Sequence, residues 1–303
     1  MKDERKGLMA TVVELPLETY QSIIEPDWCP GCGDFGVLRA LEIAAQKLKL
    51  ATKDIFVVSG IGCSSNLPGF FHAYGVHSLH GRAVAVASGA KLANHDLHVV
   101  ITGGDGDGYG IGLNHFVHAM RRNLDLTYIV MNNQIYGLTT GQASPTTNKG
   151  HKTKSTPRGN VEAPINPVAL ALVSGATYIA RGFSGEAKHL ADLIADGIAH
   201  KGFSLVDVFS PCVTYNVINT YPWFKQRVYK LEDQQGYDAT DMEAAFGKSF
   251  EWGDKIPIGV FFKVEVATFE DQLAQRMPAL KDKPFVEHDI YQRDVSPLLE
   301  ELT

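Results

Sequence analysis

The stretch LHVVITGGDGDG, residues 97–108, is followed along the chain by LTYIVMNN, residues 126–133. Each is a short β-rich run that ends in polar residues, and the chain between them is long enough for a helix. A strand–helix–strand unit of this kind forms neighbouring parallel strands. We therefore expect Asp105 and Asn133 to lie side by side at the carboxyl ends of two strands, which is the usual ligand edge of such a sheet.

The same alternation of strands and helices continues on both sides of this stretch. Strands are expected at 55–59, 97–102, 126–131, 177–181 and 204–209, and helices at about 34–50, 82–94, 109–122, 167–174 and 185–200. This predicts an α/β fold, a parallel sheet with helices on both faces. Residues 136–165 read as an extended functional loop. We expect an N-terminal arm at 1–25, the main binding domain at 26–220 and an irregular C-terminal extension at 221–303.

The amino-acid composition limits the classes of function that the chain is expected to have. The chain has 303 residues, 45% of them hydrophobic and 20% charged, as in a globular protein with one large domain. A net charge of −6 gives no sign of a nucleic-acid partner. No apolar run approaches the ~18 residues that span a bilayer, so no membrane association is expected. With no signal-peptide pattern, the chain is expected to be cytoplasmic, where cysteines serve metals or catalysis rather than disulfides.

The Gly-Asp-Gly turn predicts a metal-held diphosphate. The Asp105 carboxylate, the Asn133 amide oxygen and the Ile135 carbonyl are the hard oxygen ligands that Mg²⁺ prefers, with diphosphate oxygens completing the shell. The following helix would aim its N-terminus at the phosphates. Asp107 is the alternative ligand, and we favour Asp105 because it lies nearer the strand end. The turn followed by Asn-Asn is similar to the thiamin-diphosphate fingerprint, whereas a plain Rossmann-like turn is the alternative interpretation.

The four cysteines form a second constellation. Cys29 and Cys32 make a CxxC pair, while Cys63 and Cys212 each follow an expected strand. Four thiolates meeting at one edge could hold either zinc or a [4Fe–4S] cluster. One close pair with two distant single cysteines fits a zinc site poorly, since zinc ligands usually come as two pairs. A redox CxxC would leave Cys63 and Cys212 unexplained.

Taken together, these motifs resemble the β subunits of 2-oxoacid:ferredoxin oxidoreductases, most nearly the 2-oxoglutarate type. The segments that carry the resemblance are WCPGCG at 28–33, GIGCS at 60–64, HSLHGRA at 77–83, GGDGD at 103–107, NNQIYGLT at 132–139, GQ at 141–142 and SPCVT at 210–214. The resemblance implies that Cys29, Cys32, Cys63 and Cys212 hold one [4Fe–4S] cluster. It also implies that Asp105, Asn133 and Ile135 hold Mg²⁺ under thiamin diphosphate.

The resemblance further implies the residues of the site. Cofactor contacts are expected from Gly62, Cys63, His80, Gly104, Asp105, Gly106, Asp107, Asn133, Ile135, Tyr136, Gly137, Leu138 and Thr139. Catalytic or substrate contacts are expected from His80, Arg82, Asn66, Leu138 and Thr140. Read singly, the histidines are more often structural than catalytic. Asn66 stands where relatives often carry a lysine or arginine, and it cannot pair ionically with a distal carboxylate.

The implied activity is coenzyme-A-dependent oxidative decarboxylation of 2-oxoglutarate to succinyl-CoA and CO₂, with reduction of ferredoxin, reversible as a carboxylation. The resemblance implies an α subunit that carries the pyrimidine-activating domain, in an (αβ)₂ heterotetramer. Because of Asn66, pyruvate or a broad range of 2-oxoacids is the alternative substrate. The competing interpretations of a different class are a non-redox thiamin decarboxylase and a zinc-stapled binding protein.

Overall fold

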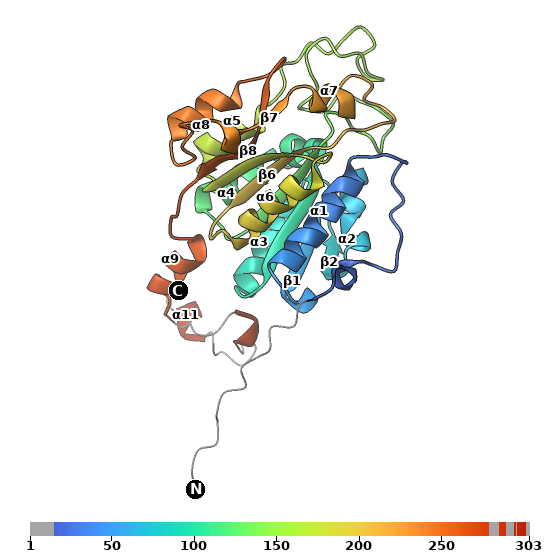
Figure 1. Ribbon diagram of the computed structural model, residues 1–303. Coiled ribbons are helices and arrows are strands. Elements are labelled where there is room, and N and C mark those ends of the chain that lie inside the picture. The colour runs from blue at the N-terminus through green and yellow to red at the C-terminus, as the bar shows by residue number, and fades with distance from the viewer. Residues whose placement is uncertain (1–14, 279–284, 289–293, 295, 301–303) are drawn as a thin grey trace.

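One mixed sheet forms the centre of the protein. The computed structural model describes residues 15–278, 285–288, 294 and 296–300. Within them the sheet has eight strands in the order β2–β1–β3–β4–β6–β5–β8–β7 (Figure 1), and only the β5–β8 pair is antiparallel. The strands are β1 (Ile55–Ser59), β2 (Tyr74–His77), β3 (His98–Gly104), β4 (Thr127–Asn132), β5 (Tyr178–Phe183), β6 (Ser204–Phe209), β7 (Val228–Lys230) and β8 (Ile256–Lys263).

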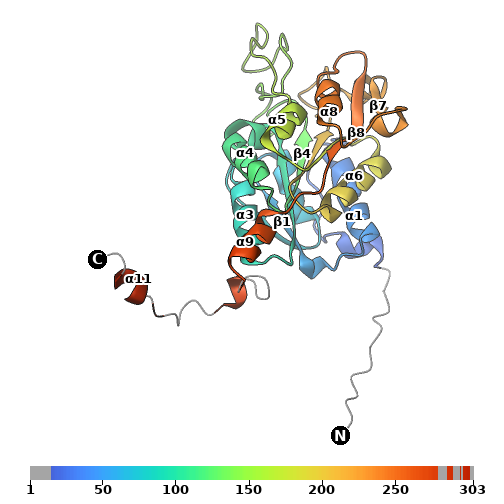
Figure 2. The same ribbon diagram turned by 90° about the vertical axis from the view of Figure 1, so that its left-hand side faces the viewer.

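Helices cover both faces of the sheet, as expected. On one face α1 (Asp34–Lys47) packs beside α6 (Ala187–Ala199), and the other face carries α3, α4, α5 and α8 (Figures 1 and 2). The remaining helices are α2 (Leu67–Phe70), α3 (Ala83–Ala93), α4 (Leu113–Arg122), α5 (Pro167–Ser174), α7 (Tyr221–Lys225), α8 (Met242–Ser249), α9 (Phe269–Arg276) and α11 (Ser296–Glu300). Short 3₁₀ turns span Leu17–Tyr20, Thr52–Asp54, Cys63–Asn66, Leu231–Asp233 and Phe285–Glu287, and a π-helical segment spans Gly106–Ile111.

The two cores follow from the pattern of apolar residues. Every residue of β4 and β6 is buried, because helices cover both faces of these central strands. In α1 the buried positions Val37, Leu41 and Ala44 recur at helical spacing and face α6. A separate core lies on the opposite face, where Phe116 and Phe203 pack with Tyr128. Helices and apolar side chains therefore cover both faces of the central strands, and the loops lie at the strand ends.

Most of the expected elements are present within a few residues, but three differences matter. The helix expected from residue 109 is preceded by a π-helical segment that begins at Gly106, directly after Asp105. Strand β2 was not expected, and it pairs with β1. The C-terminal extension expected to be irregular is more regular than that, since β8 joins the main sheet beside β5. Residues 1–14 of the expected N-terminal arm lie outside the described residues.

A buried ion pair lies in the middle of the sheet. Arg181 of β5 and Asp207 of β6 are register partners, and Arg181 Nε donates to Asp207 Oδ2 at 3.2 Å. Their exposed fractions are 3% and 0%. The guanidinium also stacks on the rings of Phe209 and Phe261. Two charges this far from water are tolerated only as a pair, because either one alone would keep its full desolvation penalty.

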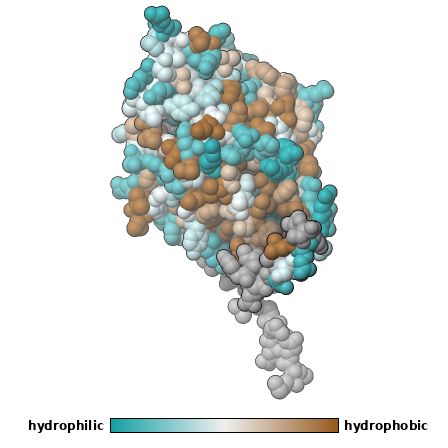
Figure 3. Space-filling model, turned by 180° about the vertical axis from the view of Figure 1, so that it is seen from behind, coloured by the Kyte–Doolittle hydropathy of each residue, from teal (hydrophilic) through white to brown (hydrophobic). Residues whose placement is uncertain are grey.

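The surface mixes polar and apolar side chains. Figure 3 shows hydrophilic and hydrophobic residues interspersed over the face seen from behind. In the part of the chain that the structure describes, no helix has both the length and the apolar character needed to cross a bilayer.

Removal of Asp207 tests the buried pair. We expect Asp207→Ala to lower the free energy of unfolding by about 3–5 kcal/mol, because Arg181 is left as an uncompensated buried charge. The double variant Asp207→Leu, Arg181→Met should recover most of that loss. Urea unfolding followed by circular dichroism measures all three proteins. The exposed pair Lys47–Asp192 is the control, and Asp192→Ala should have a much smaller effect. Equal losses from Asp207→Ala and Asp192→Ala would contradict the assignment.

Candidate active site

The carboxyl ends of β3 and β4 bring Asp105 and Asn133 together. The strands pair in parallel with Gly104 opposite Met131, so Asp105 lies one residue and Asn133 two residues beyond the last pair. The Asn133 amide oxygen accepts from the backbone N–H of Ile135 at 3.0 Å, which turns the chain at the strand end. This is the arrangement that the sequence predicted for the two strand ends.

The Asp105 carboxylate is almost completely shielded from solvent. Its exposed fraction is 1%, and the hydroxyl of Thr146 lies 2.5 Å from its Oδ2. Burial raises the pKa of Asp105 to about 6, while hydroxyls of Ser144 and Thr146 act in the opposite direction. A cation beside this carboxylate would offset the desolvation that burial imposes, so the position suits a metal ligand.

Asp107 has a different environment, because its carboxylate binds the surrounding loops. Its Oδ1 accepts from the backbone N–H of Ile61 at 3.0 Å and of Gly81 at 2.7 Å, and from His80 Nδ1 at 2.7 Å. Gly60 lies so close that a Cβ there would overlap the Asp107 carboxylate. Asp107 therefore joins the loops that follow β1 and β2, and its Oδ1 is occupied by the protein itself.

A cavity of about 110 Å³ lies against this edge. Its lining consists of Ile61, Gly62, Cys63, Ser64, His80, Gly104, Asp105, Gly106, Asp107, Asn133, Ile135, Tyr136, Gly137, Leu138 and Thr139. All the residues that the sequence predicted to contact the cofactor are in this set, with Ile61 and Ser64 in addition. The structure thus brings the predicted cofactor residues around one space. We call it the cofactor cavity.

The predicted catalytic residues divide into two groups. His80 and Leu138 line the cofactor cavity. Because its Nδ1–H donates to Asp107, the His80 ring is held in one orientation. Asn66 lies at the neighbouring cysteine cavity described next. Arg82 makes long hydrogen bonds to the two carbonyls that precede it, directly before α3. Thr140 is exposed, and its hydroxyl accepts from Lys154 at 2.6 Å. Neither lines either cavity.

All four cysteines line a second cavity, of about 230 Å³, which we call the cysteine cavity. Cys29 is exposed, and Cys32, Cys63 and Cys212 are partly buried. A Cβ at Gly137 would lie 3.6 Å from the sulfur of Cys63 and 3.8 Å from that of Cys212. The structure thus places the four thiols together at the sheet edge, as the sequence predicted. Among the described residues, no three His, Cys, Asp or Glu side chains are close enough to hold a single metal ion.

Three hydrogen bonds fasten the cysteine segments to one another. The indole N–H of Trp28, next to the CxxC, donates to the Cys63 carbonyl at 2.7 Å. The N–H of Gly33 donates to the Pro211 carbonyl at 3.1 Å. The hydroxyl of Ser210 donates to Asp34 at 2.6 Å, at the first residue of α1. Segments far apart in the sequence are therefore held in a fixed relation around the cavity.

The protein environment disfavours free thiolates in this cavity. Burial, together with the negative charge of Asp34, raises the pKa of Cys63 to about 11. Burial, followed by the charge of Asp34, also raises the pKa of Cys32 well above its usual value. The cavity would gain most from a positively charged metal centre, which stabilises thiolates directly.

Some residues of the site were not singled out from the sequence. Thr146 contacts Asp105, and Lys154 contacts Thr140; both lie in the loop expected at 136–165. Asn216 donates to the Asn133 carbonyl at 3.0 Å, which joins the segment after Cys212 to the turn after β4. A threonine, a lysine and an asparagine in loops carry no motif, so only their folded positions reveal them.

Comparison with known proteins agrees with this geometry. Residues 31–208 match the family of the thiamine pyrophosphate enzyme, C-terminal TPP binding domain. The chain is 50% identical to the 2-oxoacid:ferredoxin oxidoreductase subunit beta of Saccharolobus solfataricus, over 89% of this chain and 92% of that one. This chain belongs to the β subunits of the 2-oxoacid:ferredoxin oxidoreductases. Residues 212–277 also match the family of the C-terminal part of the pyruvate ferredoxin oxidoreductase beta subunit.

Two further relatives of this β subunit are of the 2-oxoglutarate type. The 2-oxoglutarate synthase subunit KorB of Methanocaldococcus jannaschii is 39% identical over 84% of this chain and 94% of its own. The 2-oxoglutarate:ferredoxin oxidoreductase from Magnetococcus marinus, solved with 2-oxoglutarate, coenzyme A and succinyl-CoA bound, is 37% identical. Its TM-score is 0.88, with 97% of this chain and 98% of that chain covered. The family and the α/β fold predicted from the sequence are confirmed, and a β subunit implies an α partner.

Gly106 offers a test of the cofactor cavity. A Cβ there would overlap the ring of Tyr136, whose hydroxyl donates to the Gly106 carbonyl. We expect Gly106→Ala to displace Tyr136 and to weaken thiamin diphosphate binding by roughly tenfold or more. Calorimetric titration of the cofactor-depleted complex measures this. Gly69→Ala is the matched control, since a Cβ there meets nothing within 4 Å. Unchanged affinity in Gly106→Ala would show that the cofactor does not use this cavity.

Proposed function

We propose that this chain, with its α partner, catalyses coenzyme-A-dependent oxidative decarboxylation of 2-oxoglutarate to succinyl-CoA and CO₂ and passes the electrons to ferredoxin. The observation that carries the proposal is the junction of the two cavities. Cys63, Asn133, Gly137 and Leu138 line both of them. A thiamin cofactor and an iron–sulfur cluster held in these cavities would share a wall, as a decarboxylation coupled to electron removal requires.

The oxygen donors at the strand ends fit Mg²⁺. The Asp105 carboxylate, the Asn133 amide oxygen and the Ile135 carbonyl would hold the ion under the cofactor diphosphate. Asp105 is favoured over Asp107 because Asp107 Oδ1 already accepts three hydrogen bonds from the protein. The π-helical segment that begins at Gly106 directs backbone N–H groups toward the same edge. When bound, thiamin diphosphate supplies the electron sink that lets carbon dioxide leave a 2-oxoacid.

The cysteine cavity fits a [4Fe–4S] cluster better than zinc. A tetrahedral zinc ion draws four sulfurs to ~2.3 Å, which leaves no open space between them. The cavity that these four thiols line, together with nine other residues, is about 230 Å³. One cluster held by Cys29, Cys32, Cys63 and Cys212 would fill it and would accept electrons singly. Cys29, the exposed cysteine, marks the side from which ferredoxin would approach.

The remaining parts of the activity belong to the complex. The α partner would supply the group that activates the cofactor pyrimidine, together with most coenzyme A contacts, in an (αβ)₂ assembly in the cytoplasm. The neighbour from Magnetococcus marinus carries coenzyme A. This chain's residues fix the orientation of His80 through Asp107 and cover the cavity with Leu138, which is half-exposed.

The choice of 2-oxoglutarate rests on the relatives and on one local charge. Asn66 cannot pair with a distal carboxylate, but Lys154 brings its ammonium group to 2.6 Å from Thr140 Oγ1. Thr140 follows Leu138 and Thr139, both in the cofactor cavity wall. Lys154 could therefore neutralise the distal carboxylate that pyruvate lacks. Pyruvate or a broad range of 2-oxoacids is the second candidate, favoured by Asn66 and by the general 2-oxoacid relatives.

Two substitutions separate the cofactor from the cluster. Cys29 lines only the cysteine cavity and Asp105 lines only the cofactor cavity. Anaerobically purified wild-type complex should be brown, with about four iron atoms per chain. We expect Cys29→Ser to lose iron but keep thiamin diphosphate, and Asp105→Asn to keep iron but lose the cofactor. Iron analysis and cofactor extraction measure both. Iron-free wild type with bound zinc would instead favour the binding protein, and iron-free wild type with cofactor a non-redox decarboxylase.

Lys154→Met tests the substrate. With viologen as acceptor and coenzyme A present, we expect the wild-type complex to oxidise 2-oxoglutarate faster than pyruvate. The variant should have a roughly tenfold higher KM for 2-oxoglutarate, because a charge-assisted contact is lost, and an unchanged KM for pyruvate. Lys152→Met, in the same loop, is the control. A wild type that prefers pyruvate by a wide margin would exclude 2-oxoglutarate as the main substrate.

A further inference from the structure

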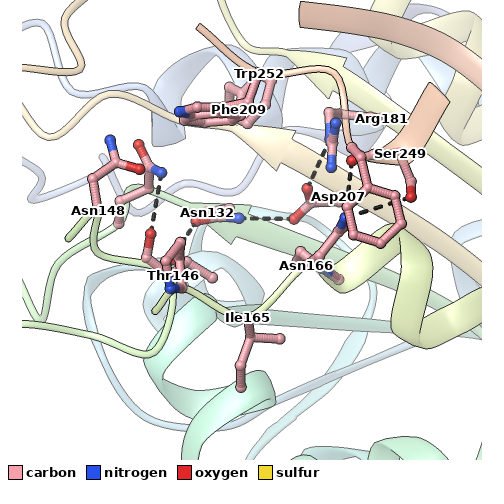
Figure 4. A pocket seen from close by; sticks show the side chains of 14 residues that line it. Asn132, Thr146, Asn148, Ile165, Asn166, Arg181, Asp207, Phe209, Ser249 and Trp252 are labelled. Atoms are coloured by element: carbon pink, nitrogen blue, oxygen red, sulfur yellow. Dashed lines mark hydrogen bonds and ion pairs between the residues drawn. The ribbon is translucent and has the colours of Figure 1, made fainter. Parts of the chain in front are cut away.

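A cavity larger than the cofactor cavity reaches Asp105 through Thr146, which lines it and contacts the Asp105 carboxylate. The larger cavity measures about 290 Å³, and its lining includes Asn132, Thr146, Arg181, Asp207 and Trp252 (Figure 4). Four of its polar side chains, from β4, β5, β6 and the loop after β4, form a chain of contacts that ends at Asp105. They are Arg181, Asp207, Asn132 and Thr146, and of these only Asn132 is part of the motifs that predict the cofactor.

The chain of contacts starts at the buried ion pair. Arg181 Nε donates to Asp207 Oδ2 at 3.2 Å, and Asn132 Nδ2 donates to Asp207 Oδ1 at 3.0 Å. Tyr109 adds a third donor, to the same Oδ1, at 3.0 Å. Because Asp207 only accepts, the NH₂ group of Asn132 must face it. The amide oxygen of Asn132 is therefore turned toward Thr146, at 2.9 Å (Figure 4).

The hydroxyl of Thr146 occupies the gap between Asn132 and Asp105. Its Oγ1 lies 2.5 Å from Asp105 Oδ2 and 2.9 Å from Asn132 Oδ1. A hydroxyl has a single hydrogen, and an ionised carboxylate is a stronger acceptor than an amide. The hydrogen therefore lies toward Asp105. Thr146 and Asp105 are 3% and 1% exposed, so little water competes for this contact.

The backbone of Thr146 is held as firmly as its side chain. Gln134 Nε2 donates to the Thr146 carbonyl at 3.2 Å, and Thr147 Oγ1 donates to the Gln134 carbonyl at 2.7 Å. Gln134 lies between Asn133 and Ile135, the two other proposed metal ligands. It has a left-handed backbone with φ of 59°, so the turn at this point is sharply defined. Two hydrogen bonds, one from the side chain of Gln134 and one to its carbonyl, thus join the loop of Thr146 to the turn that carries the proposed metal ligands.

We propose that Thr146 is a positioning residue for the metal centre. Its hydroxyl takes one oxygen of Asp105 and thereby fixes the direction in which the carboxylate faces the metal under the diphosphate. Asn132, oriented by Asp207, lies directly behind this hydroxyl, and Gln134 holds the Thr146 backbone. This inference rests on the proposed role of Asp105 as a Mg²⁺ ligand, and it adds a group that touches neither the metal nor the cofactor.

The inference predicts a specific loss. Thr146→Val keeps the shape of the side chain but removes the closer of the two hydroxyls, those of Ser144 and Thr146, that act on Asp105. Loss of a hydrogen bond to a charged group is expected to weaken Mg²⁺ binding about 10- to 100-fold at saturating thiamin diphosphate. Thr146→Ser restores the hydroxyl and should bind Mg²⁺ within about threefold of wild type.

The experiment uses the full-length chain in complex with its α partner, depleted of metal and cofactor by chelation. Mg²⁺ is titrated calorimetrically at saturating thiamin diphosphate. Mn²⁺ bound under the same conditions is read by electron paramagnetic resonance, whose line shape reports the ligand geometry. Thr127→Val is the matched control, because Thr127 is a buried threonine at the far end of β4 whose hydroxyl donates to the Gly197 carbonyl.

The outcomes separate this inference from the proposed function. Weak Mg²⁺ binding and an altered Mn²⁺ spectrum in Thr146→Val, with Thr146→Ser and Thr127→Val close to wild type, supports the positioning role. Wild-type affinity in Thr146→Val overturns it, as does an equal loss in Thr146→Ser or Thr127→Val. If Asp105→Asn binds Mg²⁺ as wild type does, the metal assignment itself fails. If only Asp105→Asn loses the metal, the positioning role of Thr146 alone fails.

Discussion

The parallel pairing of β3 with β4 is the constraint on which the site depends. With Gly104 opposite Met131, Asp105 follows the last pair by one residue and Asn133 by two, so both lie at the same edge of the sheet. A shift of one residue would change the face on which each side chain of β4 lies and the level at which Asn133 leaves the sheet, because side chains alternate along a strand. The continuous burial of β4 and its neighbours prevents such a shift, since it would move the apolar residues of two cores.

The polar interior of the sheet has a function that the apolar core cannot supply. Arg181 and Asp207 carry a large desolvation penalty, and a pair of apolar residues of the same volume would often be no less stable. Their position explains their presence. Asp207 orients Asn132, and Asn132 borders the hydroxyl that reaches Asp105. Side chains of the same strands that form the core thus orient the polar groups at the edge of the sheet where the proposed chemistry takes place.

The parts of the fold that could be predicted from the sequence are those with a local signal. Strand β6 has the expected bounds, because a short run of apolar residues between two turns predicts a buried strand. Strand β2 was missed because Tyr74–His77 is short, polar and mostly exposed, so it carries no periodicity. Strand β8 follows a stretch whose rhythm is lost, and its antiparallel place beside β5 depends on long-range packing.

The candidate site divides in the same way. Cysteines and the Gly-Asp-Gly turn are rare residue combinations, so the lining of both cavities was accessible from the sequence. Thr146 and Lys154 were not, because a loop of threonines, prolines and lysines can meet the sheet at any of its residues. Arg82 and Thr140, predicted as catalytic or substrate contacts, line neither cavity, since a residue next to a motif need not turn toward it. A motif in the sequence predicts the turn that it forms, but it does not predict which side chains from distant segments contact that turn.

The short segment 133–138 joins the two proposed centres mechanically. Gly137 faces the sulfurs of Cys63 and Cys212, and a Cβ there would be in van der Waals contact with both. At the start of the same segment, Asn133 belongs to the proposed Mg²⁺ shell, and Asn216 from the Cys212 segment donates to its carbonyl. A displacement of this segment would therefore move the cofactor wall and the cysteine wall together. The two cavities therefore share a piece of backbone, and neither can be reshaped without the other.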